Sequence, residues 1–328
     1  MGEKNDVLCA FLEKPAVFAD FVDGCLFKGK KGIRPEELSE GSKEYHVKYE
    51  ASSGKLRNAG RTRDVVKKLC RGRVYAVLAV ENQDELHYAM PFRCMEYDVA
   101  DYARQLKGIR DRHKEKNDLK SGAEYLSGMK EEDKLNPVVT IVFYHGKGEW
   151  DTCRELHDML NFEGENESFK AYTANYRMNL VTLPDMEETC FKTGLRELVG
   201  MMKRSEDKEK MKAYCRKNEE RFRYMDEETF ETVSVMTGCE KLLGYKRENP
   251  ERRGTVDMCR ALDEMMEESR MEGENAFAVL VGKLLADGRM SEVELIVTDE
   301  SRRRELFLEY GLQNLGKETI MKEGRRSD

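Results

Sequence analysis

The first half of the chain alternates between helical and strand-like hydrophobic patterns. Residues 6–27 space their apolar side chains at three and four positions, which predicts one or two short helices, with Pro15 at a boundary or in a first turn. Residues 46–60 are typical of an extended stretch that ends in a turn rich in Gly, Ser and Asn. Residues 62–70 and 74–83 are then predicted to be two strands joined by a tight basic turn.

The segment 74–83 (VYAVLAVENQ) is apolar on both faces, as expected for a central buried strand. A long crossover helix is predicted over residues 86–116, and further strands are predicted within residues 136–145 and 176–183. The expected buried stripe of the helix consists of Met95, Val99, Tyr102 and Leu106.

From residue 186 onward the pattern changes to amphipathic helices rich in Glu, Lys and Met. The order of elements predicts an α/β domain over residues 1–185, with a mixed central sheet flanked by helices. An acidic all-α region over residues 186–328 follows, with packing or self-association as its expected role.

The composition is typical of a water-soluble protein, with 39% hydrophobic and 37% charged residues. No stretch approaches the 18 or more apolar residues of a membrane-spanning helix, and the first residues lack the apolar core of a secretory signal. We therefore expect a cytoplasmic protein that does not enter a membrane. The nine cysteines are scattered without a C-x-x-C pair, which favours reduced thiols over zinc ligands or disulfides.

The net charge of −7 conceals a basic run between residues 51 and 79, in which Asp64 is the only acidic residue. The basic residues of this run are Lys55, Arg57, Arg61, Arg63, Lys67, Lys68, Arg71 and Arg73. Because they border Asp64 on both sides, they are candidates for contacts with the phosphates of DNA. A solvated basic hairpin without a partner is the alternative.

Asp64, Glu81 and Gln83 form the strongest candidate site. Asp64 lies on the first predicted strand, and Glu81 and Gln83 lie at the end of the second, on one face because side chains of a strand repeat every two residues. Two carboxylates on neighbouring strands can converge on a magnesium ion, and a polar residue two positions later can orient the attacking water. Burial of Glu81 after the run from Val77 to Val80 would be costly unless it is paired or metal-bound.

A simpler interpretation competes with this site, since D-x16-E-x-Q is a loose pattern. Glu81 could reach solvent at the end of its strand, and Asp64 could pair with Arg61 or Arg63.

Several segments occur here in the order in which a known family has them: IRPEEL, RDVVKKL, AVLAVENQ, HYAMPFRCMEYD, GAEYLSG and NPVVTIVFYHGKGEW. With them, roughly residues 1 to 240 resemble the recombination-promoting nuclease and transposase family of the PD-(D/E)XK nuclease superfamily. The combination of R-D-V, E-N-Q, M-P-x-R and Y-x-G-x-x-x-W is more specific than any one motif.

The resemblance implies a restriction-endonuclease-like core and cleavage of DNA with Mg²⁺ or Mn²⁺, linked to recombination or transposition. It matches Asp64 and Glu81 to the two acidic metal ligands. Gln83 stands where the superfamily usually has lysine, so it is expected to orient water or a ligand carboxylate by hydrogen bonds.

The resemblance also singles out residues around this set. Arg93 and Tyr97 match the M-P-x-R-x-x-x-Y stretch, and they could contact a phosphate, support the site or simply pack the helix on the sheet. Tyr144 and His145 end the last core strand, where α/β sites gather, although a lone histidine there is more often structural. Asp23 stands where the family is expected to have Asn, and it could add a carboxylate or face water.

The sequence therefore predicts a metal-dependent DNA endonuclease that forms homodimers through its helical region. Two rivals stay open. One is a catalytically weak nucleic-acid-binding or transposon-associated accessory protein with the same fold. The other is a scaffold whose helices mediate assembly.

Overall fold

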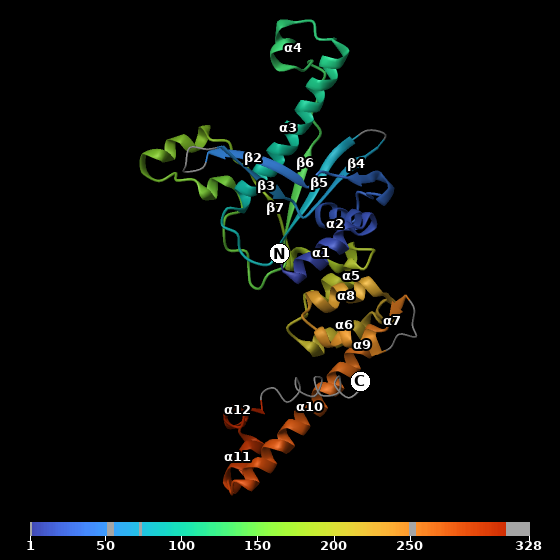
Figure 1. The fold of residues 1–328 in the computed structure, drawn as a ribbon, viewed down its shortest axis with the longest axis vertical. Helices are drawn as coiled ribbons and strands as arrows, with labels where there is room; N and C mark the ends of the chain where they lie inside the picture. The colour runs from blue at the N-terminus through green and yellow to red at the C-terminus, as the bar shows by residue number, and fades with distance from the viewer. Residues whose placement is uncertain (1, 51–55, 72–73, 249–253, 313–328) are drawn as a thin grey trace.

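The structure is a computed structural model, and it describes residues 2–50, 56–71, 74–248 and 254–312. A mixed α/β part is followed by a mostly helical C-terminal region (Figure 1). The α/β part is built on a five-stranded sheet in the order β1-β4-β5-β6-β7. Its strands are β1 (Leu38–Glu40), β4 (Val65–Cys70), β5 (Val74–Gln83), β6 (Val138–Tyr144) and β7 (Asn179–Thr182).

Antiparallel and parallel pairs make this sheet mixed. β4 is antiparallel to β1 and β5, whereas β6 is parallel to β5 and β7. The central strand β5 buries Val77 and Ala79 on one face and Leu78 and Val80 on the other. The prediction of a central buried strand over residues 74–83 is thus confirmed, as is a mixed sheet flanked by helices.

Helices cover both faces of the sheet. The crossover helix α3 (Met90–Lys116) joins β5 to β6 and packs on the face that carries Ala79. Helices α1 (Glu3–Glu13) and α2 (Pro15–Phe27) pack on the opposite face, as predicted for this segment. Pro15 occupies the first turn of α2, where its missing N–H has no helical partner to lose.

The buried face of α3 differs from the expected one. Val99 is 58% exposed, while Met90, Cys94, Tyr97 and Asp101 are buried. The prediction of a stripe through Met95, Val99, Tyr102 and Leu106 is wrong for Val99, and the other three are only half-buried. The reason is that the buried face of α3 includes acidic side chains with cationic partners. A prediction from the apolar residues alone therefore assigns the wrong face of the helix to the core.

The segment before β4 also differs from the expectation. Part of the predicted extended stretch forms a separate antiparallel pair, β2 (Glu44–Glu50) and β3 (Leu56–Thr62). The predicted strand 62–70 begins only at Val65, because β3 ends at Thr62 and the chain turns between the two strands. The short edge strand β1 was not predicted.

The C-terminal region is mostly helical, as expected. Its helices are α5 (Leu195–Met202), α6 (Lys208–Lys217), α7 (Glu219–Arg223), α8 (Glu227–Met236), α9 (Glu240–Glu248), α10 (Met258–Ala286), α11 (Met290–Thr298) and α12 (Glu300–Glu309). A short strand pair joins them, β8 (Met225–Asp226) with β9 (Thr255–Val256). Short helices also lie in the connections of the α/β part: α4 (Gly122–Ser127), η1 (Pro35–Glu37), η2 (Leu156–Met159), η3 (Gly164–Tyr172), η4 (Leu183–Asp185) and η5 (Glu188–Cys190).

One continuous core joins both parts of the chain. Helix α1 packs on α8, and one buried cluster runs from Leu8 on α1 to Met265 on α10. The domain boundary at residues 185 and 186 stays a prediction, although side chains from both sides of it share this core.

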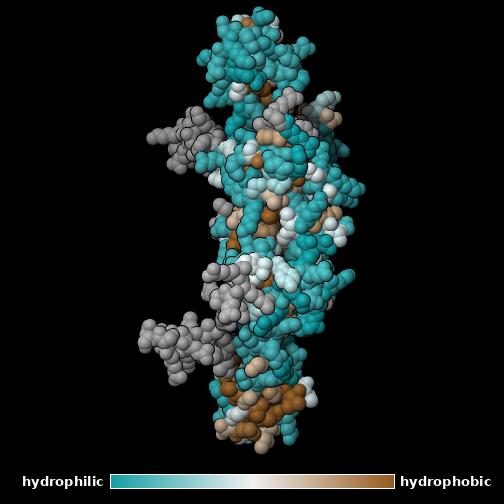
Figure 2. All heavy atoms as spheres, turned by 90° about the vertical axis from the view of Figure 1, so that its right-hand side faces the viewer, coloured by the Kyte–Doolittle hydropathy of each residue, from teal (hydrophilic) through white to brown (hydrophobic). Residues whose placement is uncertain are grey.

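The far end of α10 forms a smaller unit with α11 and α12. Its buried cluster consists of Leu280, Leu284, Ile296, Leu306 and Leu312. Apolar side chains also gather on the surface of this end of the molecule (Figure 2). The exposed large apolar residues of α11 and α12 are Met290, Leu295, Val297 and Leu308. None of the helices that the structure describes is both long enough and apolar enough to cross a membrane.

Candidate active site

The β4–β5 ladder brings Asp64 and Glu81 together. Val65 pairs with Val80 in this antiparallel ladder, so the next position toward the same end sets Asp64 opposite Glu81. Directly opposed residues of neighbouring strands have Cβ atoms about 4.5–5.5 Å apart. Two acidic residues that are 17 positions apart in the sequence therefore lie side by side at one end of this ladder, close enough for the charge of Asp64 to raise the pKa of Glu81.

Glu81 is fully buried beneath α3, with 0% exposure. Its Oε2 lies 3.3 Å from Arg93 Nη2 and its Oε1 lies 3.5 Å from Arg63 Nε. Oε1 has no hydrogen-bond partner among the described residues. Burial, with the negative charge of Asp64 as a second cause, raises the pKa of Glu81 to about 7, although both arginines oppose the shift. The alternative that Glu81 reaches solvent is wrong.

Asp64 lies at the rim of the sheet, in the turn before β4. Its Oδ2 accepts a hydrogen bond of 2.8 Å from the backbone N–H of Asn82, and the side chain of Asn5 on α1 also hydrogen-bonds to it. Burial raises the pKa of Asp64, while the Asn82 N–H and the charge of Arg93 act in the opposite direction. Asp64 is therefore held against the end of β5 by both neighbouring elements.

Gln83 shares the face of Glu81, two residues later on β5, and it is half-buried. Its Nε2 donates a 2.7 Å hydrogen bond to the carbonyl oxygen of Asn82. This bond fixes the amide, and it leaves the amide oxygen and one N–H proton without a partner among the described residues.

Arg93 and Tyr97 lie over Glu81, four residues apart on α3. Arg93 Nε donates to Tyr97 Oη at 3.0 Å, and Tyr97 Oη donates to the carbonyl of Thr62 at 3.5 Å. The guanidinium carbons of Arg63 and Arg93 lie 5.0 and 5.6 Å from the centroid of the Tyr97 ring. The tyrosine thus positions both arginines that approach Glu81.

Two basic residues that the sequence assigned to the DNA surface lie inside the protein. Arg63 is 1% exposed and pairs with Asp101 at 2.6 Å, and Lys67 is 1% exposed and pairs with Glu40 at 2.6 Å and Glu13 at 2.9 Å. Their burial conflicts with the expectation that they track a phosphate backbone, because burial of a lysine or arginine requires anionic partners close by. Both are internal counter-ions instead.

The other basic residues of the run are placed as follows. Lys68 is half-buried, and Arg71 is exposed and lies 3.3 Å from Glu37. Lys55 and Arg73 lie outside the described residues, and so do the side chains of Arg57 and Arg61, whose backbone belongs to β3.

A buried polar network behind Glu81 was not anticipated from the sequence. Thr140 donates to Asp98 at 2.5 Å, Tyr176 donates to the same carboxylate at 2.7 Å, and Arg63 also donates to Thr140. Burial raises the pKa of Asp98. A usable signal existed, because Cys94, Asp98 and Asp101 fall on one helical stripe. Acidic residues on such a stripe indicate buried counter-ions.

The remaining candidates have hydrogen bonds and ring contacts of their own outside this network. Tyr144 packs edge-to-face on Trp150, with ring centroids 5.2 Å apart, and donates to the Lys147 carbonyl. The His145 ring packs at a tilt against Phe143 on the opposite face of the sheet, with ring centroids 5.5 Å apart, and burial lowers the pKa of His145. Asp23 neither faces water nor joins the site: its carboxylate accepts from the N–H groups of Lys31 and Gly32 at 2.8 and 3.1 Å.

The donor set fits a hard divalent cation. In the parts of the chain that the structure describes, no group of three or more His, Cys, Asp or Glu side chains could hold a metal ion. Asp64 and Glu81 nevertheless offer two carboxylates, and Glu81 Oε1 has no hydrogen-bond partner among the described residues, although Arg63 Nε lies 3.5 Å from it. Mg²⁺ is often bound through one or two carboxylates, with water and substrate phosphate as its other ligands. These two residues could therefore serve as the protein ligands of such an ion.

Comparison with protein families gives one match. The family described as "Putative transposase, YhgA-like" matches residues 65–229, half of the chain. The chain belongs to this transposase family. The match confirms the relationship expected from the motifs, and it includes Glu81, Gln83, Arg93 and Tyr97, with Asp64 immediately before it. Searches of curated proteins and of solved structures found no match. As a transposase family, it implies DNA as the partner.

Proposed function

We propose that this member of the transposase family is a metal-dependent DNA endonuclease with a restriction-endonuclease-like core, acting in recombination or transposition. The observation that carries the proposal is the placement of Asp64 beside Glu81 at the end of the β4–β5 ladder, with Glu81 fully buried and its Oε1 without a hydrogen-bond partner among the described residues. A carboxylate in this position is costly unless a cation compensates it.

Each residue has a distinct role in this proposal. Asp64 and Glu81 hold Mg²⁺ or Mn²⁺, which when bound supplies charge stabilisation at the scissile phosphate and activates water. Gln83 uses its free amide oxygen to orient the attacking water, since it cannot supply positive charge. Arg93 is only partly buried, so its guanidinium can turn from Glu81 to a DNA phosphate. Lys68 and Arg71 are the described members of the basic run that are accessible for a contact with DNA.

Nicking of supercoiled plasmid DNA tests this function. We expect nicking with Mg²⁺ or Mn²⁺ that is abolished by EDTA, by Asp64→Asn and by Glu81→Gln. Gln83→Ala is expected to lower the rate with little change in DNA affinity, because it acts on water. Glu85→Gln is a matched control, since Glu85 is an exposed carboxylate two residues beyond Gln83. Metal-dependent nicking that survives in folded Glu81→Gln protein would refute the proposal.

A second function is favoured by the two arginines beside Glu81. Because both carboxylate oxygens face a guanidinium, Glu81 is already compensated without a metal. This arrangement suits an accessory protein that binds nucleic acid and cuts it weakly or not at all. That protein would show salt-dependent DNA binding in the same preparation that fails to nick.

We also propose that a second copy of the chain covers the apolar surface of α11 and α12. Val297 and Leu308 are 62% and 63% exposed there, beside the buried cluster that holds the three helices together. Apolar surface gathered at one end of a protein is typical of an interaction site. A homodimer formed in this way would leave the edge that carries Asp64 open to DNA.

A further inference from the structure

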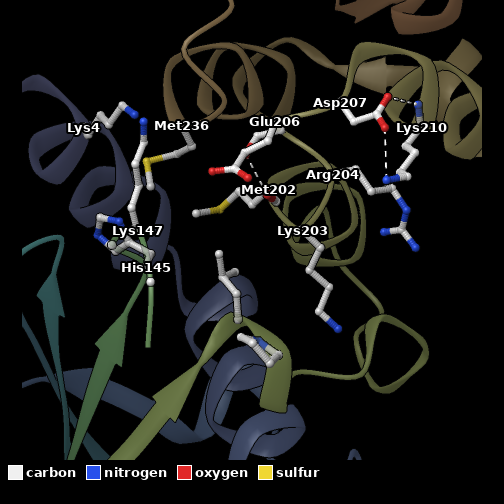
Figure 3. A pocket seen from close by; sticks show the side chains of 15 residues that line it. Lys4, His145, Lys147, Met202, Lys203, Arg204, Glu206, Asp207, Lys210 and Met236 are labelled. Carbon is white, nitrogen blue, oxygen red and sulfur yellow. Dashed lines mark hydrogen bonds and ion pairs between the residues drawn. The ribbon is translucent and has the colours of Figure 1, made fainter. Parts of the chain in front are cut away.

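A basic pocket lies beside the candidate active site. It has a volume of about 680 Å³ and is enclosed by the loop after β6, η4, the loop between α5 and α6, and the first turn of α1 (Figure 3). Its lining carries the cationic side chains Lys4, Lys147, Lys203, Arg204 and Lys210. Glu206 and Asp207 are the acidic residues of the lining, so positive charge is in excess.

The cations on one wall are already paired. Lys210 Nζ lies 3.0 Å from Asp207 Oδ2, and Arg204 and Lys203 share Glu188 at 2.9 and 3.7 Å. These contacts hold the wall formed by the α5–α6 loop in place. They also neutralise part of the positive charge of this wall.

Lys4 and Lys147 differ from these, because neither forms an ion pair with any residue that the structure describes. Both are exposed, and in Figure 3 both extend toward the same side of the pocket. Two ammonium groups that approach one space repel each other, and an anion between them removes that repulsion. The unpaired charge of the pocket is therefore concentrated on these two residues.

The loop that carries Lys147 is built to lie close to β5. A Cβ atom at Gly146 would be 2.1 Å from the carbonyl oxygen of Asp84, so a larger residue there would push the loop away. Gly148 has a φ of +87°, a conformation that favours glycine. These two glycines fix Lys147 between them at the mouth of the pocket.

The pocket and the candidate active site share two structural elements. The N–H of His145 in the pocket wall donates to the carbonyl oxygen of Gln83 at 2.9 Å. On α1, Lys4 lines the pocket while the next residue, Asn5, hydrogen-bonds to Asp64. A strand of DNA presents a phosphate about every 3.4 Å of helix axis. Phosphates a few nucleotides from a bond cut at Asp64 and Glu81 could therefore reach the pocket along these shared elements.

We infer that this pocket binds backbone phosphates of the DNA strand that flanks the scissile bond, with Lys4 and Lys147 as the contacts. The inference deepens the proposed function and rests on it for the choice of DNA as ligand. Lysine suits this role as a point charge that reads no base. No Phe, Tyr or Trp side chain is among the described residues that line the pocket, so stacking on a base is not expected. Binding should be independent of base sequence.

Fluorescence anisotropy with a 5′-labelled single-stranded 20-mer tests the inference, in EDTA so that no cleavage occurs. We expect K4A/K147A to raise the Kd several-fold. The logarithm of its association constant should also fall less steeply with the logarithm of the salt concentration, by about 1.4 in slope, because two phosphate contacts are lost. The change should be equal for two unrelated base sequences. K4R/K147R should keep the wild-type slope. The control K116A/K120A removes two exposed lysines, one at the end of α3 and one in the connection to α4, and it should leave the Kd and the slope unchanged.

An unchanged slope in K4A/K147A, or an equal loss in the control, would overturn the inference. So would calorimetry in which tripolyphosphate binds through Lys4 and Lys147 while the DNA slope is unaffected, because the pocket would then serve a free polyphosphate. The two proposals fail separately. If the wild-type protein does not nick DNA but K4A/K147A has a weaker salt dependence of binding, the proposed cleavage is refuted and the proposed phosphate pocket is supported. If the wild-type protein nicks DNA but K4A/K147A keeps the wild-type salt dependence, the proposed phosphate pocket is refuted and the proposed cleavage is supported.

Discussion

Arg93 Nη2 lies 3.3 Å from Glu81 Oε2, whereas the second arginine beside this carboxylate, Arg63, is closed off from solvent. The two guanidinium groups therefore differ in their freedom to change partners. Arg93 keeps about a quarter of its side chain exposed and can exchange Glu81 for a phosphate, while Arg63 is fixed by Asp101. One arginine is suited to binding and the other to holding the site together.

Arg93→Ala is expected to slow plasmid nicking by about tenfold to a hundredfold, because a charge-assisted contact of about 1.5–3 kcal/mol is lost. Arg93→Lys should recover only part of the rate, since lysine lacks the planar fork. Arg104→Ala on the same helix serves as the control, and its nicking should match wild type. Nicking by Arg93→Ala at the wild-type rate would exclude the proposed role of Arg93.

Arg63→Ala should lower the free energy of unfolding by about 3–5 kcal/mol, because it removes the buried cation that Asp101 and Glu81 share and leaves them only the more exposed Arg104 and Arg93. Arg104 contacts the same Asp101 at 3.0 Å from a more exposed position. Arg104→Ala should therefore cost only about 0–1 kcal/mol. Urea denaturation measures both changes, and equal losses in the two variants would contradict the assignment of Arg63 as the internal counter-ion.

Sequence patterns predicted the elements whose patterning is local. The apolar run of β5 gave its bounds, and Pro15 marked the start of α2. The edge strand β1 is not predicted, because three residues are too few to show the alternation of apolar and polar side chains that marks a strand. Arg63 and Lys67 were expected at the surface, because their partners lie elsewhere in the sequence: Asp101 on α3, Glu13 on α1 and Glu40 on β1.

In the candidate site, too, the sequence predicts the residues of one local ladder but not the contacts between distant segments. Asp64, Glu81 and Gln83 could be chosen from strand periodicity and family motifs, since one short ladder brings them together. The network of Asp98, Thr140 and Tyr176 depends on contacts between α3, β6 and the segment before β7. No local pattern specifies such contacts. The approach of Lys4 to the loop after β6 is likewise a result of tertiary packing.

The connection between α3 and α4 should respond to pH through His113. Hydrogen bonds of 2.7 Å to Asp118 and to Asp133 raise the pKa of His113, and Lys130 and Arg112 complete the charged groups around it. Because the folded-state pKa is above the unfolded value of about 6.5, the stabilisation is complete below that value and is lost as pH rises through the folded pKa.

The amide of Gly128, which donates to the Glu124 carbonyl at 2.7 Å, reports on this region. Its hydrogen-exchange protection, corrected for intrinsic rates, should fall as the pH rises above about 6.5. His113→Asn should remove that dependence. Constant protection in wild type across this range would show that His113 does not stabilise the α4 segment through its charge.

Self-association should depend on the apolar end of the molecule. We expect sedimentation velocity to show a dimer for wild type and a monomer for M290E/V297E, because a charge cannot be buried unpaired in an apolar interface. Leu126→Glu is the matched control, since Leu126 is 90% exposed on α4 at the other end. A wild-type monomer at micromolar concentration, or a dimer that persists in M290E/V297E, would rule out this interface.

The central claim is that Asp64 and Glu81 hold one divalent cation. Crystals of the wild-type protein soaked with Mn²⁺ test it most directly, through anomalous difference density. We predict a single strong peak within coordination distance of both carboxylates, absent from crystals of Glu81→Gln treated in the same way. No peak between Asp64 and Glu81 at saturating Mn²⁺, with Glu81 still bound to Arg63 and Arg93, would contradict the claim.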